Sequence, residues 1–304
     1  MSQPTIAVVG AAGFIGSALV RRCETDGIAC QQFTRARPFR TGRGELAPEL
    51  AYCDVVYWLA SSIRPAVAQA EASQADLDAF RALLSGLASR AGEGSVGRPR
   101  IVMVSSGGTV YDPAQPPPYS ELSATRAVND YGRAMLTLEA ELRERWPGHV
   151  VVRASNVYGP GQLARRGQGV IAHWFEAIAT GTPIRVIGDP DSRRDYVFVD
   201  DLVAALMSCG RDPSPPQTVN IGSGNGTSLT TLSNLVVSTA GRAVTVEQAP
   251  ARSFDAPSTW LDISLAERSL GWRPRVELPE GLRRTWRVAR HANNRGPLSP
   301  DPAA

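Results

Sequence analysis

The chain has 304 residues, of which 43% are hydrophobic and 20% charged, a balance typical of a globular protein with a sizeable core. The formal net charge is only +3, and neither a basic stripe nor a nucleic-acid-binding module is present, so we expect no nucleic-acid partner. No apolar run reaches the roughly 18 residues of a membrane span, the first residues lack a secretory signal pattern, and the four cysteines show no metal-ligand or disulfide spacing. We therefore expect a cytoplasmic protein without a metal or a membrane anchor.

Short apolar runs alternate with longer helical stretches through the first half of the chain. We expect strands where β-branched and other apolar residues run together, at residues 5–9, 28–33, 55–59, 101–104 and 150–153. We expect helices where apolar residues recur at helical spacing, at residues 14–23, 65–90 and 129–146. This alternation predicts an α/β fold with a Rossmann-like, doubly wound parallel sheet.

A glycine-rich turn joins the first expected strand to the first expected helix. Glycines at such a turn let the backbone approach a pyrophosphate, and the helix N-terminus adds N–H groups and the positive end of a dipole. Because the turn directly follows the first strand, it predicts a dinucleotide-binding site. The residues assigned to cofactor binding here are Gly10, Ala12, Gly13, Phe14, Ile15 and Gly16.

The GxxGxxG spacing of this turn resembles that of the extended short-chain dehydrogenase/reductases, in particular the nucleotide-sugar 4-epimerases of the NAD-dependent epimerase/dehydratase family. Six further blocks are similar to family motifs and occur in the family's order. They are SSGGTVYD (105–112), DYG (130–132), RASNVYGPGQ (153–162), RRDYVFVDDL (193–202), NIGSGNGTSL (220–229) and LDISLAERSLGW (261–272). The resemblance covers nearly the whole chain and implies a nucleotide-sugar substrate, a UDP-sugar foremost, and a homodimer.

The resemblance also implies two domains, and the pattern of the chain changes after Asn156, where Gly and Pro become frequent. The dinucleotide-binding domain is expected at residues 1–158, with residues 195–222 returning to it. A smaller mixed α/β substrate-binding domain is expected at residues 159–194 and 223–292. Residues 293–304 are expected to form a flexible tail.

The residues after the second expected strand bear on the choice between NAD and NADP. NAD-preferring members of the family have an acidic residue here that holds the ribose hydroxyls, whereas this chain has Thr34 and Arg35, then Arg37. An arginine here would hold the 2′-phosphate of NADP, but both arginines are equally consistent with a solvated loop, so the cofactor is expected to be NAD or NADP. Residues 34–54 are too few for the further strand and helix that the family usually has, which predicts an abbreviated sheet edge.

The resemblance assigns the remaining cofactor contacts to Leu59, Ala60 and Ser61, which follow the third expected strand, and to Tyr131 and Met135. In the family, a tyrosine acts as general base or acid on a sugar hydroxyl, and a lysine four residues later binds the nicotinamide ribose and lowers the tyrosine pKa. Tyr131 matches the tyrosine, but Met135 stands at the lysine position, and the chain contains no lysine.

Without this lysine, the phenolate form of Tyr131 lacks its usual source of stabilisation. A free tyrosine has a pKa of about 10, so ionisation at neutral pH requires roughly 4 kcal/mol of differential stabilisation. A thioether contributes little of this. The charge of the oxidised nicotinamide, Arg64 or Arg133 would have to substitute, and Arg133, two positions from Tyr131, is on another helix face, which favours Arg64.

The catalytic hydroxyl of the family is also altered. Alignment on the TVY segment puts Gly107 where the family has Ser or Thr, so Ser106 and Thr109 are the candidate hydroxyls. Capping of the backbone at the strand end is an equally good interpretation of each. The dehydratases of the family carry an acidic residue at the position of Thr109. A threonine at this position resembles the 4-epimerases instead.

On the substrate side, the resemblance assigns Asn156 to the sugar or diphosphate, and Arg194 and Arg252 to the nucleotide diphosphate. Arginine suits this role because its planar guanidinium donates two parallel hydrogen bonds to phosphate. Arg64 is assigned to the same side.

The leading hypothesis is an NAD(P)-dependent nucleotide-sugar epimerase that inverts C4 of a UDP-hexose or UDP-N-acetylhexosamine through a 4-keto intermediate. Met135 and Gly107 keep two alternatives open: a cofactor- and sugar-binding protein with impaired turnover, and a dehydratase or reductase with an atypical tyrosine site.

Overall fold

The computed structural model describes residues 4–42, 44–63, 70–92, 97–164, 169–251 and 258–293. The strands are β1 Ile6–Val9, β2 Cys30–Phe33, β3 Val55–Trp58, β4 Arg100–Ser106, β5 His149–Ala154, β6 Asn156–Tyr158, β7 Ile184–Ile187, β8 Arg193–Arg194, β9 Tyr196–Phe198, β10 Thr218–Ile221, β11 Thr227–Ser228 and β12 Val246–Ala249. The helices are α1 Phe14–Thr25, α2 Ala70–Gly92, α3 Asp130–Arg145, α4 Val170–Thr180, α5 Val199–Arg211, α6 Leu229–Ala240, α7 Ser264–Leu270 and α8 Leu278–Asn293, with a 3₁₀ helix at Pro48–Tyr52.

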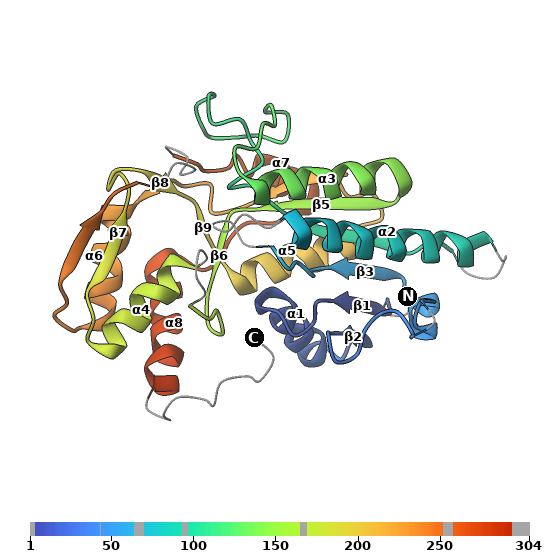
Figure 1. Ribbon diagram of the computed structural model, residues 1–304, viewed down its shortest axis with the longest axis horizontal. Helices are drawn as coiled ribbons and strands as arrows, with labels where there is room; N and C mark the ends of the chain where they lie inside the picture. The colour runs from blue at the N-terminus through green and yellow to red at the C-terminus, as the bar shows by residue number, and fades with distance from the viewer. Residues whose placement is uncertain are drawn as a thin grey trace.

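A six-stranded sheet with the order β10-β5-β4-β3-β1-β2 organises the larger part of the molecule (Figure 1). Every neighbouring pair in it is parallel. The strands are short and buried, and helices connect them, as expected for parallel strands covered on both faces. The predicted Rossmann-like, doubly wound parallel sheet is confirmed.

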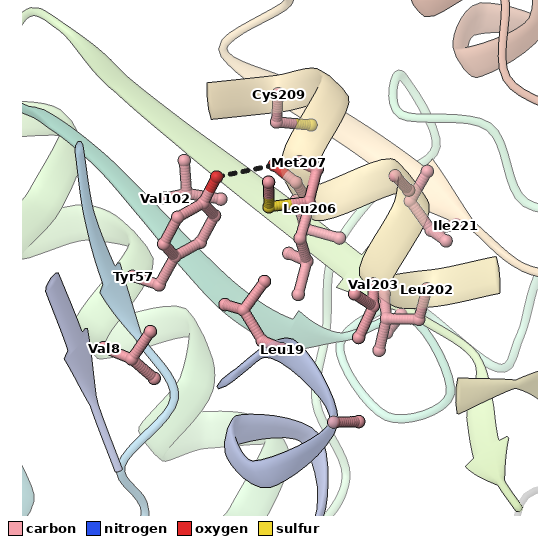
Figure 2. Close-up of a cluster of buried hydrophobic side chains, with 14 of the residues drawn as sticks. Val8, Leu19, Tyr57, Val102, Leu202, Val203, Leu206, Met207, Cys209 and Ile221 are labelled. Atoms are coloured by element: carbon pink, nitrogen blue, oxygen red, sulfur yellow. Dashed lines mark hydrogen bonds between the residues drawn. The ribbon is translucent and has the colours of Figure 1, made fainter. Parts of the chain in front are cut away.

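One face of the sheet is covered by α1 and α5. Ile6 and Val8 of β1 point to this side, where they join a buried cluster with residues of both helices. Figure 2 shows this cluster, in which the hydroxyl of Tyr57 donates a hydrogen bond of 3.1 Å to the carbonyl oxygen of Leu206 in α5. The bond satisfies the polar atom of a tyrosine that is otherwise surrounded by apolar side chains.

The opposite face is covered by α2 and α3. Ala7 and Val9, the alternate residues of β1, belong to this second cluster together with Trp58 and Phe80, whose rings lie 4.8 Å apart. Met135 of α3 is part of the same cluster and is 3% exposed. The alternation along β1 therefore divides the core into two layers.

A smaller unit lies at one end of the sheet, where α4, α6, α8 and β7 gather (Figure 1). Its core is separate and includes Trp174, Phe175 and Trp286, the last two stacked at 5.2 Å. Three two-stranded pairings accompany it, β7 with β12, β8 with β11, and β6 with β9. Short strands and helices mix here, as in the smaller α/β unit predicted from the sequence.

The chain crosses between the two units more than once. After β8, the chain returns through β9 and α5 to β10, which pairs with β5 at the edge of the main sheet. Helix α7 packs on α5 and β10, and Ala266 and Trp272 join the core under α1 and α5. The exact domain boundaries stay a prediction.

The other edge of the main sheet is β2, as the short 34–54 connection predicted. Instead of a further strand, this connection forms the 3₁₀ helix and inserts Leu46 and Leu50 into the cluster beneath α2. Arg90 of α2 donates hydrogen bonds to the carbonyl oxygens of Leu46 and Ala47, which fastens the connection to that helix.

None of the helices within the described ranges is long and apolar enough to cross a lipid bilayer.

Candidate active site

A large cleft of about 1340 Å³ opens at the carboxyl ends of β1, β4 and β5 and extends to the smaller unit. In open parallel α/β sheets, ligands bind at this edge. The sequence-assigned residues that line the cleft are Phe14, Ile15, Ser106, Thr109, Tyr131, Asn156 and Arg194. Residues predicted from separate motifs are thus brought to one surface.

The glycine turn at the end of β1 is built for close backbone contact. Gly10 has φ of +95°, and a Cβ placed on it would lie 2.7 Å from backbone atoms of Leu59 and Ala60. A Cβ on Gly16 would collide with the Gly10 carbonyl oxygen, so glycine is required at both positions. The turn therefore packs directly against the residues that follow β3.

The N-terminus of α1 is open to an anion. Gly13, the N-cap residue of α1, has no side chain, and the first turn of the helix contains no acidic residue. Ala12 and Gly13 are exposed, and no side chain caps the first N–H groups of the helix, which lack intrahelical partners. The residues of this turn fit a dinucleotide pyrophosphate.

The other assigned cofactor residues are spread over the ends of β2 and β3. Leu59 and Ala60 are partly buried against Gly10, while Ser61 is exposed and its hydroxyl accepts a hydrogen bond of 3.2 Å from the Ile63 N–H. Thr34 and Arg35 follow β2 directly. None of these five residues lines the cleft itself, so their cofactor roles stay predictions.

Tyr131 lies in the first turn of α3. The Asn129 side chain caps this helix by accepting a hydrogen bond of 2.8 Å from the Gly132 N–H, which fixes where α3 begins. Burial raises the pKa of Tyr131 to about 12, and the negative charge of Asp76 on α2 acts in the same direction. Asp76 is itself buried and accepts a hydrogen bond of 2.7 Å from the Ser62 N–H.

Met135 follows one helical turn after Tyr131 but does not reach the cleft. Its side chain is 3% exposed and packs in the core between the sheet and α3. The position that the family gives to a lysine is thus filled by an apolar side chain, and it supplies no charge to Tyr131.

The candidate hydroxyls lie on the turn after β4. Ser106 is partly buried and its carbonyl oxygen accepts hydrogen bonds from the N–H groups of Thr109 and Val110. The Thr109 hydroxyl is buried and has no hydrogen-bond partner among the described residues. An unpaired buried hydroxyl costs free energy, so Thr109 has an unused donor and acceptor beside the cleft, as does Ser155, which also lines it.

The glycine at position 107 leaves no room for the missing family hydroxyl. A Cβ there would lie 2.7 Å from a methyl carbon of Leu261 and 3.1 Å from the Arg153 carbonyl oxygen. Leu261 is 1% exposed and cannot move away freely. The space of a serine side chain is therefore occupied by packing.

On the far side of the cleft, Asn156 is exposed at the start of β6, and its side chain donates a hydrogen bond of 2.9 Å to the Asp195 carbonyl oxygen. Arg194 is partly buried on β8, where Nη1 donates to the Arg193 carbonyl oxygen at 2.9 Å. Arg64 and Arg252 lie outside the described residues.

The sequence analysis did not identify the residues that the smaller unit contributes to the lining of the cleft. His173 and Trp174 of α4, Arg185 of β7 and Asp189 all line the cleft. Their spacing along the chain carries no motif, because only the packing of α4 and β7 brings them to this surface. Within the described ranges, no group of His, Cys, Asp and Glu side chains is arranged to hold a metal.

Comparison with known proteins gives one consistent result. The model of the NAD dependent epimerase/dehydratase family matches residues 6–222. The chain is 31% identical over 302 residues to a UDP-glucose 4-epimerase of Mycolicibacterium smegmatis, covering 91% of this chain and 96% of that protein. It is also 34% identical over 187 residues to a dTDP-4-dehydro-6-deoxyglucose reductase of Escherichia coli, covering 60% and 59%.

Solved structures are similar over nearly the full length. The UDP-glucose 4-epimerase of Thermotoga maritima, solved with UDP-glucose, has a TM-score of 0.83 at 27% identity and covers 95% of this chain and 99% of its own. The Thermus thermophilus UDP-glucose 4-epimerase, solved with NAD, has a TM-score of 0.81 at 25% identity with the same coverages. Fold and cleft define a Rossmann-like α/β protein of the kind that uses a nicotinamide dinucleotide. The chain belongs to the NAD dependent epimerase/dehydratase family.

Proposed function

We propose that the chain is an NAD(P)-dependent nucleotide-sugar epimerase that inverts C4 of a UDP-hexose or UDP-N-acetylhexosamine. The observation that carries this proposal is the continuous cleft. Its lining includes Phe14 and Ile15 at the start of α1, Tyr131 of α3, and Asn156 and Arg194. A cofactor at one end and a nucleotide diphosphate at the other would leave the sugar beside the tyrosine hydroxyl.

The proposed roles follow from the positions of the chain's own groups. The glycine turn and the start of α1 would hold the dinucleotide, which would supply the reversible two-electron redox chemistry. Tyr131 accepts the proton of the C4 hydroxyl as the sugar is oxidised and returns it when the ketone is reduced on its other face. Thr109, whose buried hydroxyl has no hydrogen-bond partner among the described residues, would donate a hydrogen bond to the C4 oxygen after its side chain turns toward the cleft.

The substrate side of the proposal rests on charge and on the relatives. Arg194 would hold a phosphate through paired hydrogen bonds, and Asn156 would bind the sugar or the diphosphate. Three of the similar proteins described above are UDP-glucose 4-epimerases, one of them solved with UDP-glucose and one with NAD. Thr109 takes the place of an acidic side chain that an elimination would use, which favours epimerisation.

The test is incubation of the purified protein with UDP-glucose, UDP-galactose and their N-acetylhexosamine counterparts, with each cofactor added. We expect interconversion of a C4 pair. Tyr131→Phe should lower turnover by at least about 100-fold, the contribution of a general acid–base group, and leave cofactor binding unchanged. Tyr52→Phe, at a tyrosine that is 74% exposed, is the matched control. Equal turnover in wild type and Tyr131→Phe would remove Tyr131 from the mechanism.

A second candidate function is a binding protein with impaired turnover. It is favoured by Met135, which is buried and uncharged, and by Leu261, which fills the space of the missing hydroxyl at Gly107. Binding of cofactor and UDP-sugar without any product would support it. A dehydratase or reductase is the third candidate, for which the Escherichia coli reductase is a relative. Formation of a product other than the C4 epimer would identify it.

A homodimer and a cytoplasmic location are part of the same proposal. Sedimentation analysis would test the first, and cell fractionation the second.

A further inference from the structure

Ser155 follows β5 directly, at the edge of the sheet where the cleft opens. The pairing of β4 with β5 sets Ser106 opposite Ala154, so the next step along both strands sets Gly107 opposite Ser155. The Gly107 N–H donates a hydrogen bond of 2.7 Å to the Ala154 carbonyl oxygen, which continues the ladder to this step. Gly107 and Ser155 also border the same small void beside the cleft. The residue that has lost the family hydroxyl and Ser155 are therefore neighbours.

The side chain of Ser155 belongs to the α3 side of the sheet. Two residues earlier, Arg153 is hydrogen-bonded to Glu139 of α3. Because side chains alternate along a strand, residue 155 returns to the same side. Helix α3 also carries Tyr131, and Tyr131 and Ser155 both line the cleft. A sugar beside the tyrosine is thus within the region that Ser155 faces.

The Ser155 hydroxyl is buried and unpaired, while its backbone is fixed. Its side-chain oxygen has no hydrogen-bond partner among the described residues, although the residue is only 8% exposed. The Ser155 N–H donates a hydrogen bond of 2.9 Å to the Ile221 carbonyl oxygen at the end of β10. An unpaired buried hydroxyl costs free energy, and a ligand oxygen in the cleft would supply the missing partner.

The neighbouring carboxylate of Asp195 does not depend on this hydroxyl. Its Oδ1 accepts hydrogen bonds of 2.7 Å from both the N–H and the hydroxyl of Ser223, and its Oδ2 accepts one of 3.2 Å from the Leu261 N–H. Burial raises the pKa of Asp195, and these bonds and the nearby Ser155 hydroxyl act against the rise. Ser155 and Asp195 are nevertheless not hydrogen-bonded to each other, so the hydroxyl stays available to the cleft.

We propose that Ser155 is a catalytic residue whose hydroxyl donates a hydrogen bond to the C4 oxygen of the sugar, in place of the hydroxyl missing at Gly107. The inference rests on the proposed function, because it requires a sugar beside Tyr131. As the ketone is reduced, its oxygen gains negative charge and can accept several hydrogen bonds, so Ser155 acts together with Tyr131 and Thr109. The bond strengthens with this charge and therefore lowers the barrier more than it tightens substrate binding.

The experiment compares the wild type with Ser155→Ala, using UDP-glucose and UDP-N-acetylglucosamine with NAD and NADP both present. We expect Ser155→Ala to lower kcat and kcat/KM by about 10- to 100-fold, the value of a hydrogen bond to a charged group, at unchanged KM. The free energy of unfolding in urea should not fall, because the substitution removes a buried hydroxyl that has no partner.

The matched control is Ser233→Ala, at a serine of α6 that is 5% exposed and does not line the cleft. Its hydroxyl donates a hydrogen bond of 2.9 Å to the Thr230 carbonyl oxygen. The same atom is deleted from an equally buried site, so kcat and KM should stay at the wild-type values.

The outcomes separate the inference from the proposed function. Turnover of neither sugar by the wild type would overturn both. Wild-type turnover that Ser155→Ala leaves unchanged would overturn the inference alone. A rise in KM at unchanged kcat would also overturn it, because the hydroxyl would then bind substrate and transition state equally. A loss of stability in Ser155→Ala as large as that in Ser233→Ala would make the hydroxyl a structural partner of Asp195, which likewise overturns the inference.

Discussion

The tyrosine at the cleft stands in surroundings that favour its protonated form. Burial raises the pKa of Tyr131, and the negative charge of Asp76 raises it further. The residue one turn away, Met135, is apolar and buried. In the oxidative half of an epimerisation, the tyrosine must accept a proton, so the reaction depends on the small fraction of phenolate. A positive charge near the ring would increase this fraction.

This environment makes a prediction about pH. Because the pKa of Tyr131 is raised to about 12, the phenolate fraction and the kcat/KM for sugar oxidation should rise with pH through the neutral and alkaline range. In Met135→Lys, an ammonium group beside the ring should lower the tyrosine pKa and shift the rising limb to lower pH. The measurement is the pH profile of kcat/KM for both proteins.

The control for this shift is Met135→Leu, which keeps the apolar volume and should leave the profile in place. A lysine in the core between the sheet and α3 also costs stability, so all three proteins are compared by urea unfolding before their rates are compared. A profile of Met135→Lys that coincides with the wild type would show that position 135 does not influence the proton transfer.

At the scale of elements, a buried ion pair ties α3 to the sheet. Glu139 of α3 accepts hydrogen bonds from both Nε and Nη2 of Arg153 on β5, at 3.1 and 2.6 Å. It also accepts a bond of 2.5 Å from the Ser105 hydroxyl on β4. The Arg153 guanidinium lies 5.0 Å from the centre of the Tyr111 ring. These contacts fix the helix that carries Tyr131 against the two strands that end at the cleft.

Removing one charge of this ion pair should destabilise the fold. Glu139→Gln leaves the guanidinium of Arg153, which is 5% exposed, without its countercharge. Breaking one side of a buried pair costs about 3 kcal/mol or more, so we expect a loss of that size in the free energy of unfolding, measured with urea. Glu144→Gln, an exposed acid on the same helix, should change it by less than about 0.5 kcal/mol. Equal effects of the two substitutions would show that the pair contributes no specific stability.

The elements of the main sheet could be predicted because their signals are local. Apolar runs such as residues 55–59 become strands, and the glycine turn becomes the start of α1. The pairings β6 with β9 and β8 with β11 involve strands of two or three residues, which leave no periodic pattern. The same limit holds for the site. Tyr131 and Asn156 carry motifs, whereas Asp76, Leu261 and Trp174 reach the cleft region only through long-range packing.

At the scale of the whole molecule, the proposed cofactor side of the cleft is on the main sheet and the proposed nucleotide side is toward the smaller unit. Phe14 of α1 and Arg194 of β8 both line it. A ligand that binds only the folded protein stabilises it by about 2.7 kcal/mol at 100 times its dissociation constant. UDP and the dinucleotide should therefore each raise the unfolding temperature, and each should act through its own end of the cleft.

This division predicts how one substitution separates the two ligands. Arg194→Gln should weaken the binding of UDP by about 10-fold or more, because a charged hydrogen bond to phosphate is lost. UDP should then raise the unfolding temperature of the variant only at a correspondingly higher concentration. The stabilisation by the dinucleotide should be the same as in the wild type, because its contacts are on the sheet. Thermal unfolding with each ligand titrated separately measures both effects. If UDP stabilises the variant at the wild-type concentration, Arg194 does not hold the diphosphate; if the dinucleotide effect falls as well, the two ends of the cleft are not independent sites.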